Sequence, residues 1–532
     1  MSSIRRRLAS PAGLAVTGIV VIGLAVGLGV QFAPHRAPLP SIARPTGAPT
    51  PSASAADPAV AVDDLRVPVR NPGAMGAGAS APAEGGTSGS SEPGASASYV
   101  DSGDDAAEAV ESDAAAPAPG PGEARYVASN GDDDGPGTVA RPWRSPAHAA
   151  AAAPAGSTIY LRGGTYPGFA VTRSGLTFAS YPGEIATVSD GTREDVVEFD
   201  GVTGGALRGL VVTGSTTQYG SGVKIDESAS ISIIGTTVRQ NRTWGIVVVR
   251  SSGVLIQDND IWGNANGIEE RYADGLTIAG NRIHDNASMV DAGRGRQGIN
   301  FYKSTGAVSV SGNQLWNNGT HFEIYGASNL TITGNATWNG QVMETGTDGP
   351  ACDGNRFIRN VSYRGRGLDE RANGLILRCA SNMLVAHNTI HGFDQFALDI
   401  VDGTQGVEYG GSIANLRIAN NILSGGRAYS IDNALPASVS IDYNLLYNVG
   451  STAVYGSHLA YVAGVGNLDT LDAFRAATGY EVHGRFGDPA FLNAGGGDLR
   501  IGSGSPAVDG GAVILGDGYR GSAPDMGRFE AP

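Results

Sequence analysis

Carboxylates, amides and basic side chains recur at related positions in the middle of the chain, between residues 266 and 346. The set is Glu269, Arg271, Asn300, Tyr302, Lys303, His321, Glu323, Tyr325 and Glu344. Paired carboxylates can act as acid and base on a glycosidic bond. A lysine whose pKa is lowered by neighbouring cations can act as a base on a carbon acid. These residue types therefore predict either a hydrolytic or an eliminating site.

β-Elimination on a uronic-acid polymer is the first interpretation of this set. It needs a base that removes a ring proton and a cation that neutralises the substrate carboxylate. Lys303 is the expected base, because Arg271 and Arg294 would lower the pKa of its amine by charge repulsion. Tyr302, next to it in sequence, completes the catalytic candidates. The expected substrate contacts are Asn300, Tyr325, His321 and Arg294.

Calcium is the expected cofactor of such a site, since it is a hard cation that prefers carboxylate oxygens. Its candidate ligands are Glu269, Glu323 and Glu344. The same glutamates would allow glycoside hydrolysis. On stacked strands, Glu323 and Glu344 would lie about 5 Å apart, and Glu269 and Glu323 about 10 Å apart. Those separations are near retaining and inverting geometries, so the spacing permits hydrolysis without selecting it.

A repeat of about 22 residues must position these side chains. Each copy holds short alternating runs separated by polar turns, which is typical of strands. An asparagine follows the second run of each copy, and the set is Asn259, Asn281, Asn313, Asn335, Asn355, Asn388, Asn421 and Asn444. We therefore predict an all-β solenoid in which these amides hydrogen-bond along the stack.

Every second residue of a strand points outward, so outward residues of neighbouring coils form columns. The first predicted column is Lys224, Val247, Glu269, Asn300, Glu323, Glu344, Ile376 and Asp399. The second is Asp226, Val249, Arg271, Tyr302, Tyr325, Gly346, Arg378 and Val401. Polar and aromatic residues in both columns favour a surface for an extended glycan, with an ordinary solvated sheet face as the alternative.

An insertion of about ten residues at 287–296 falls between the strands of Glu269 and Asn300. It would bring Asp291, Arg294 and Arg296 beside this face as partners for a ligand. A loop that only decorates the turn is the alternative.

The chain has 532 residues, a net charge of −15 and two cysteines. This composition excludes a disulfide-rich scaffold and offers no basic field, so no nucleic-acid partner is expected. Cys352 and Cys379 fall in consecutive coils, where a disulfide and two reduced buried thiols are both open. His284, His387 and His391 fall near turns of separate coils and are expected to be structural or solvent-facing.

The N-terminal region predicts export. Three arginines at 5–7 precede an apolar run at 12–33 that is long enough to span a bilayer. Residues 1–33 are therefore a signal anchor, which would tether the chain to a membrane, or a cleaved signal peptide. Residues 34–122 are rich in Pro, Ala, Gly and Ser without an apolar face, which predicts a disordered linker. We expect an extracytoplasmic protein, membrane-anchored or secreted.

Two segments carry a family resemblance. The opening at 124–166, from ARYVASNGDDDGPGT to LRGGTY, resembles the start of extracellular right-handed parallel β-helix proteins. The tail GDPAFLNAGGGDLRIGSGSPAVDGGA with DMGRFE resembles their close. Exported proteins with this opening include calcium-dependent pectate lyases of polysaccharide lyase family 9, which use a lysine base. The resemblance implies that role for Lys303, although the family's dense cluster of calcium-binding aspartates is not recognisable in this sequence.

The resemblance implies a right-handed parallel β-helix over 123–532, with a short N-terminal capping helix, coils at about 175–450 and a C-terminal cap at about 464–532. The cap includes a helical segment at 468–479. We expect a monomer whose partner is a polysaccharide substrate or a cell-wall glycan. Lyase-like cleavage is the leading interpretation, and hydrolysis by paired glutamates or glycan binding without catalysis are the alternatives.

Overall fold

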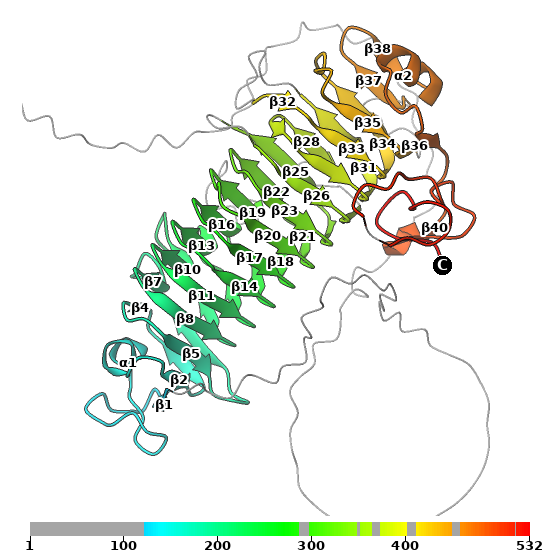
Figure 1. Ribbon diagram of the computed structural model, residues 1–532. Coiled ribbons are helices and arrows are strands. Elements are labelled where there is room, and N and C mark those ends of the chain that lie inside the picture. The colour runs from blue at the N-terminus through cyan, green and yellow to red at the C-terminus, as the bar shows by residue number, and fades with distance from the viewer. Residues whose placement is uncertain are drawn as a thin grey trace, which may run out of the picture. The chain divides into compact units, whose positions relative to one another are not determined.

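The computed structural model describes residues 122–286, 297–347, 352–363, 373–401, 411–448, 458–516 and 518–532 (Figure 1). In these residues, parallel strands stack coil upon coil, and each middle coil contributes three strands to three faces. The predicted signal segment at 1–33 and nearly all of the predicted linker at 34–122 lie outside the described residues. Within the described part, no helix has the length and apolarity needed to cross a membrane.

The first face carries the predicted outward columns. Its strands are β4 (Phe169–Val171), β7 (Val197–Asp200), β10 (Ser221–Asp226), β13 (Trp244–Val249), β16 (Asn266–Arg271), β19 (Gln297–Tyr302), β22 (Thr320–Tyr325), β25 (Gln341–Gly346) and β28 (Leu375–Leu377). The face continues through the C-terminal parts of β31 (Thr389–Ile400) and β34 (Ile422–Ile431) to β37 (Ala460–Val462).

The second face is a parallel sheet of 13 strands. They are β1 (Ala124–Val127), β2 (Thr158–Leu161), β5 (Leu176–Ser180), β8 (Thr203–Arg208), β11 (Ala229–Ile234), β14 (Leu255–Gln257), β17 (Leu276–Ala279), β20 (Val308–Ser311), β23 (Leu330–Thr333), β26 (Arg356–Ile358), β30 (Leu384–Ala386), β33 (Arg417–Ala419) and β35 (Ser440–Asp442).

The third face closes each coil. Its strands are β3 (Gly164–Tyr166), β6 (Ala186–Ser189), β9 (Val211–Thr213), β12 (Thr237–Arg239), β15 (Asp260–Trp262), β18 (Arg282–His284), β21 (Gln314–Trp316), β24 (Ala336–Trp338), β27 (Val361–Tyr363), β36 (Leu445–Asn448) and β39 (Arg485–Phe486). The N-terminal parts of β31 and β34 also belong to it, because these two long strands run through the corner between the third and first faces.

Helices and short strands close both ends of the stack. The helix α1 (Pro146–Ala152) begins at Ser145, whose side chain accepts the N–H of His148 at 3.1 Å. The helix α2 (Leu471–Thr478) ends at Gly479, and its Phe474 stacks on a coil tyrosine, Tyr429, with ring centroids 5.3 Å apart. Both predicted helices are thus confirmed. The remaining elements are β29 (Ala380–Ser381), β32 (Ile413–Ala414), β38 (Gly466–Leu468), β40 (Phe491–Asn493), β41 (Asp498–Ile501) and a 3₁₀ turn at Ala494–Gly496.

Inward positions of the first face form a continuous apolar column. Strand register aligns Val223, Ile246, Ile268, Ile299, Phe322, Met343, Leu375 and Leu398, and each is 0% exposed. Burial of each such side chain stabilises the fold by roughly 1.5–3 kcal/mol. Because a strand alternates its side chains, this column also fixes which residues reach the surface.

An asparagine ladder runs along the turn between the second and third faces. The Nδ2 of each residue donates to the Oδ1 of the next at 2.9–3.1 Å, through Asn259, Asn281, Asn313, Asn335, Asn360, Asn388, Asn421 and Asn444. The predicted ladder is confirmed except at one position, where Asn360 replaces Asn355. Asn355 precedes β26 instead of following it, and its amide donates to the Ala327 carbonyl at 2.9 Å.

A second ladder, not foreseen from the sequence, occupies the turn between the third and first faces. Asn241, Asn264, Asn286 and Asn318 donate in succession at 3.1–3.2 Å. The next coil has Gly340 at this place, and the imidazole of His321 fills the space, with Nδ1 3.3 Å from the Asn318 amide. The spacing of five residues between the members of the two ladders was the available signal.

Candidate functional site

The first predicted outward column is confirmed rung by rung. Strand register aligns Lys224, Val247, Glu269, Asn300, Glu323, Glu344, Ile376 and Asp399. The column continues beyond the prediction to Ser430 and Tyr461. The second column is confirmed through Asp226, Val249, Arg271, Tyr302, Tyr325 and Gly346. The fold therefore places most of the candidate residues on one face.

Glu269 is the most enclosed carboxylate of the first column, with 3% of its surface exposed. Its Oε1 accepts Arg271 Nε at 2.8 Å, and its Oε2 accepts Asn300 Nδ2 at 2.9 Å. The Arg271 guanidinium also lies over the Trp244 ring, 5.2 Å from the centroid. Burial raises the pKa of Glu269, although the charge of Arg271 and these hydrogen bonds oppose the rise. Glu269 and Arg271 thus form a partly buried pair with Asn300 directed at it.

Glu323 and Glu344 stand on neighbouring rungs in different electrostatic environments. Gln297 Nε2 donates to Glu323 Oε2 at 2.6 Å. Burial, reinforced by nearby carboxylates, raises the pKa of Glu323 to about 7. Glu344 instead forms an ion pair with Arg378 and accepts Gln341 Nε2 at 2.9 Å. Near neutral pH, a protonated Glu323 can therefore stand beside an arginine-paired carboxylate.

Asp399 lies two rungs beyond Glu344, and sequence reasoning placed it in the column without assigning it a role. Burial raises the pKa of Asp399 to about 7, and the charges of Asp432 and Glu344 add to the rise. Asp399 is 9% exposed, and its Oδ1 lacks a hydrogen-bond partner among the residues that the structure describes. The face therefore holds a second carboxyl that can keep a proton near neutral pH.

Tyr302 and Tyr325 stack on consecutive rungs, with ring centroids 5.4 Å apart and planes inclined by 3°. The edge of Tyr272 meets Tyr302 at 6.1 Å. Because the two stacked rings face each other along the coil axis, the faces that meet are closed to a sugar. A ligand would therefore meet the edges, the hydroxyls or the outer faces of this stacked pair.

Lys303 follows β19 at a turn, with a left-handed φ of 54°. Its backbone N–H donates to the Tyr325 carbonyl at 2.8 Å, and its Nζ lies 5.0 Å from the Tyr302 ring centroid. Arg271, one of the two cations expected to lower the Lys303 pKa, is paired with Glu269. The other, Arg294, lies outside the described residues, as do Asp291 and Arg296.

The three predicted calcium ligands do not converge on one point. Glu269, Glu323 and Glu344 are spread over four rungs, with Asn300 between the first two. Each carboxylate already accepts a hydrogen bond or ion pair from an amide or a guanidinium. Across the described ranges, no group of three His, Cys, Asp or Glu residues is placed to hold a metal ion. This donor set does not fit calcium.

The position of His321 disagrees with its expected contact to a substrate. The side chain is 0% exposed and lies at the end of the second asparagine ladder. Burial lowers the pKa of His321 to about 3, so the ring is neutral and can accept the Asn318 amide. His321 therefore completes the ladder where Gly340 offers no side chain.

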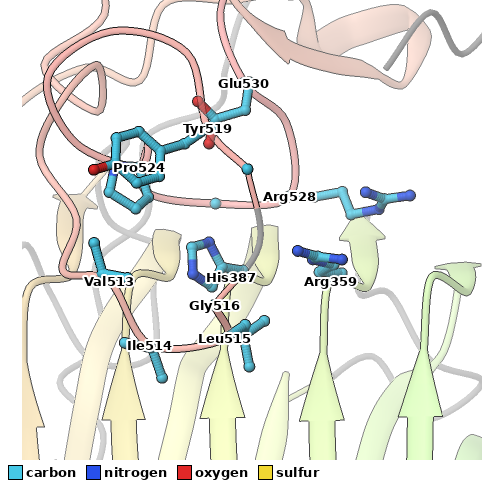
Figure 2. A pocket seen from close by; sticks show the side chains of 12 residues that line it. Arg359, His387, Val513, Ile514, Leu515, Gly516, Tyr519, Pro524, Arg528 and Glu530 are labelled. Atoms are coloured by element: carbon cyan, nitrogen blue, oxygen red, sulfur yellow. The ribbon is translucent and has the colours of Figure 1, made fainter. Parts of the chain in front are cut away.

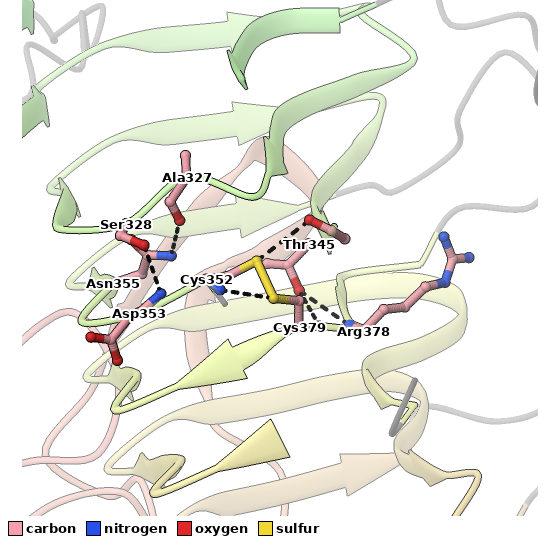
Figure 3. Close-up of a disulfide and its surroundings, with 9 residues drawn as sticks. Ala327, Ser328, Thr345, Cys352, Asp353, Asn355, Arg378 and Cys379 are labelled. Carbon is pink, nitrogen blue, oxygen red and sulfur yellow. Dashed lines mark hydrogen bonds between the residues drawn. A yellow bond between two sulfur atoms is a disulfide. The ribbon is translucent and has the colours of Figure 1, made fainter. Parts of the chain in front are cut away.

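A disulfide joins Cys352 and Cys379, whose Cα atoms are 5.5 Å apart (Figure 3). Of the two states left open by the sequence, the disulfide is the one confirmed. The backbone N–H groups of Arg378 and Cys379 both donate to Thr345 Oγ1 at 3.1 Å. The bond therefore anchors the segment that carries Arg378, the ion-pair partner of Glu344.

A cavity of about 60 Å³ lies away from the first face, beneath the C-terminal tail (Figure 2). Arg359, His387 and Arg528 line it together with apolar residues of the tail. It is small compared with the roughly 300–1,000 Å³ of typical small-molecule pockets. Burial lowers the pKa of His387 to about 4, and Asn420 Nδ2 lies 2.8 Å from its Nε2, which fits the expected structural role. The candidate site therefore stays with the first face.

The third face carries a row of stacked rings, namely Trp262, His284, Trp316, Trp338 and Tyr363. His284 lies 4.0 Å from Trp316, and its nitrogens contact Asp260 at 3.0 Å and Asp285 at 2.7 Å. These contacts make His284 a structural member of the row, as expected.

Fold and face together define a parallel β-helix with a column of carboxylates on one side. The sequence profile described as a right handed beta helix region matches residues 197–337. The described residues thus form a right-handed parallel β-helix, in agreement with the predicted fold class.

An uncharacterized protein of Bacillus subtilis (strain 168), YwoF, is 27% identical to the chain over 203 residues. The match covers 32% of this chain and 43% of YwoF, so the chain spans less than half the length of that relative.

Several solved structures are similar in fold. XylC in complex with xylose has a TM-score of 0.49 and 11% identity, over 61% of this chain and 83% of XylC. Pectate lyase Pel9A has a TM-score of 0.44 and 16% identity, over 77% of this chain and 96% of Pel9A. The catalytic unit of a GH87 alpha-1,3-glucanase from Streptomyces thermodiastaticus strain HF3-3 has a TM-score of 0.46 and 12% identity, over 62% and 63%. Similarities at this level carry no conclusion about activity.

Proposed function

We propose that the protein hydrolyses glycan chains that bind along the first face of the β-helix. The observation that carries this proposal is the pairing of Glu323 and Glu344 on adjacent rungs, one with a raised pKa and the other bound to Arg378. Adjacent strands lie about 4.8 Å apart, and retaining glycosidases hold their two carboxyl groups roughly 5–5.5 Å apart. A protonated carboxyl beside an ionised one supplies an acid and a nucleophile.

The reaction would proceed in two displacements. The Glu344 carboxylate attacks the anomeric carbon while Glu323 gives its proton to the glycosidic oxygen, so the carbon–oxygen bond breaks and the leaving chain gains a hydroxyl. A glycosyl ester on Glu344 results. Glu323, now a carboxylate, then takes a proton from water, and the water oxygen attacks the anomeric carbon and releases Glu344. The sum is one water added across one glycosidic bond.

Neighbouring amides would orient the substrate. Gln297 holds one oxygen of Glu323, and Gln341 and Arg378 each hold one oxygen of Glu344, so both carboxyl groups have fixed orientations. Asn300 lies between the Glu269 and Glu323 rungs with its amide directed at Glu269. Such amides and carboxylates bond well to sugar hydroxyls along an extended chain.

Elimination on a uronic-acid polymer is the second candidate. The observation that favours it is the placement of Lys303 beside Tyr302 at the end of β19, next to the rung of Arg271. In that mechanism Lys303 removes a ring proton and an unsaturated sugar forms.

A product assay separates these mechanisms. The full-length protein is incubated with neutral and uronic-acid polysaccharides, with and without Ca²⁺, while reducing ends and the ultraviolet absorbance of unsaturated sugars are followed. New reducing ends without absorbance, abolished in Glu323→Gln and Glu344→Gln, are the expected result. Absorbance that disappears in Lys303→Ala would replace hydrolysis by elimination. If glycans bind but neither new reducing ends nor unsaturated sugars appear, the protein binds glycans without cleaving them.

We also propose that the protein acts outside the cytoplasm, tethered to a membrane or secreted. The arginines at 5–7, the apolar run at 12–33 and the Cys352–Cys379 disulfide support this, because disulfides persist mainly in oxidising compartments. Cell fractionation, with the mass of the mature chain, distinguishes an anchored chain from a cleaved one. Recovery of the intact chain in the cytoplasm alone would overturn the proposal.

A further inference from the structure

Three basic side chains of the predicted columns, Lys224, Arg271 and Arg378, lie against carboxylates. Lys224 Nζ is 3.3 Å from Glu198 and 3.5 Å from Asp226. Further along the stack, the ion pairs are Arg271 with Glu269 at 2.8 Å, and Arg378 with Glu344. These pairs form on the face itself, between residues of one strand or of neighbouring coils. These three positive charges are therefore neutralised locally before a ligand arrives.

This face carries more carboxyl groups than these cations pair with. Glu323 and Asp399 occupy the same column as Glu269 and Glu344, and neither forms an ion pair within the described part of the chain. Beyond burial, the charges of Glu344 and Glu269 raise the pKa of Glu323, and those of Asp432 and Glu344 raise the pKa of Asp399. Once the pH exceeds about 7 and these two carboxyls ionise, the field along the central rungs is therefore negative.

We infer that the first face binds a neutral glycan and discriminates against uronate-containing chains, because glutamates neutralise Arg271 and Arg378 while further carboxyls line the same column. This inference rests on the proposed hydrolytic function and names its substrate class. A neutral sugar offers hydroxyls that donate to the carboxylates and accept from the amides of Gln297 and Asn300. Above pH 7, a uronate would bring a like charge to Glu323 and Asp399, while Arg271 and Arg378 are already paired with glutamates.

The substrate class and the mechanism agree with each other. Elimination requires a uronate, whose carboxylate must be neutralised so that the adjacent ring proton can leave. Hydrolysis requires only the glycosidic bond and the two carboxyl groups. A face that repels uronates is therefore suited to hydrolysis and not to elimination.

Matched pairs of glycans test the inference. The full-length protein is titrated calorimetrically above pH 7, where Glu323 and Asp399 are ionised. The ligands are neutral oligosaccharides and their C6-oxidised uronate counterparts of equal linkage and length, each at low and physiological salt. We expect the neutral member of a pair to bind on the order of tenfold more tightly, with the difference shrinking as salt screens the charges. Equal or tighter binding of the oxidised member overturns the substrate class while glycan binding stands. If no glycan of any matched pair binds, the proposed hydrolytic function is overturned as well.

Variants that replace a carboxylate by an amide test whether the first face causes the preference for neutral glycans. Asp399→Asn removes one carboxylate from the column and should narrow the preference for neutral glycans about threefold. The control is Asp260→Asn, which removes the same charge from β15 on the third face and should leave the preference unchanged. An equal effect of both variants would show that net charge of the whole chain, not this face, sets the preference.

Discussion

Two glutamates on the same column differ because of the side chains that reach them. Glu323 is held by the neutral amide of Gln297, whereas Glu344 is held by the charged guanidinium of Arg378. In a partly buried place, a neutral partner leaves the cost of desolvating a carboxylate largely uncompensated, and a cation offsets it. Burial is accordingly the main cause that raises the pKa of Glu323, and the hydrogen bond from Gln297 opposes it only in part.

The activity should depend on the protonation of Glu323. As the acid, Glu323 must carry a proton in the free enzyme, so activity is present below its pKa and declines as pH rises through about 7. A profile of kcat/KM against pH checks this limb. A profile that stays flat across this range would contradict the assignment of Glu323 as the acid.

Gln297 should set the pH at which the activity declines. The hydrogen bond from Gln297 stabilises the ionised form of Glu323 and so lowers its pKa. Gln297→Ala removes the bond and should move the alkaline limb to higher pH, without abolishing activity. The matched control is Gln314→Ala, an exposed position on the third face, which should leave the profile in place. A shift to lower pH in Gln297→Ala would contradict the stated geometry.

At the scale of the elements, the repeat made the outward columns predictable. Alternation along each strand and a buried apolar column fix the register, since a slip by one residue would turn the whole apolar set outward. The positions of His321 and Gln297 were not predictable in this way. They depend on side-chain torsions between coils, and in the case of His321 on the missing side chain of Gly340. Arg378 was placed in its column, but its pairing with Glu344 was likewise not predicted.

The asparagine ladder should carry much of the stability. Asn335 is 1% exposed, donates to the Val310 carbonyl at 3.0 Å and to Asn360 at 3.0 Å, and accepts from Asn313 at 2.9 Å. Asn335→Ala leaves several buried groups without partners, at about 1–3 kcal/mol each, so we expect a loss of about 3–5 kcal/mol of unfolding free energy. Chemical denaturation measures it, with the exposed Asn467→Ala as control. A loss below about 1 kcal/mol would contradict the structural role.

The disulfide between neighbouring coils should stabilise the domain through the unfolded chain. It closes a loop with a sequence separation of 27 residues, for which loop-closure entropy corresponds to about 3–4 kcal/mol. A Cys352→Ala, Cys379→Ala double variant should lose about that much unfolding free energy in denaturant titrations. Unchanged stability of the double variant relative to the oxidised wild type would show that the bond contributes nothing.

For the whole molecule, buried carboxyls make stability depend on pH. Burial is the main cause that raises the pKa of Glu270 to about 8 and those of Glu323, Asp399 and Glu481 to about 7. Between the unfolded pKa, near 4, and these folded values, the folded state binds more protons than the unfolded state. The contribution to stability is therefore complete at low pH and is lost as pH rises through 7 to 8.

Denaturation midpoints should accordingly be higher at pH 5 than at pH 8. The net charge of −15 at pH 7 acts in the same direction, because self-repulsion grows as carboxyls ionise. Glu270→Gln separates the two causes, since it removes one buried titrating group of the core and should reduce the pH dependence. A wild-type midpoint that rises from pH 5 to pH 8 would contradict the account.

The anomeric configuration of the first product tests the central claim most directly. Once a glycan is cleaved, proton NMR during the earliest turnover reports whether the new reducing end keeps the configuration of the broken bond. Catalysis by Glu323 and Glu344 on adjacent rungs predicts retention, with accumulation of no product in Glu344→Gln. Inversion would contradict this pair and favour carboxyl groups two rungs apart, such as Glu344 and Asp399.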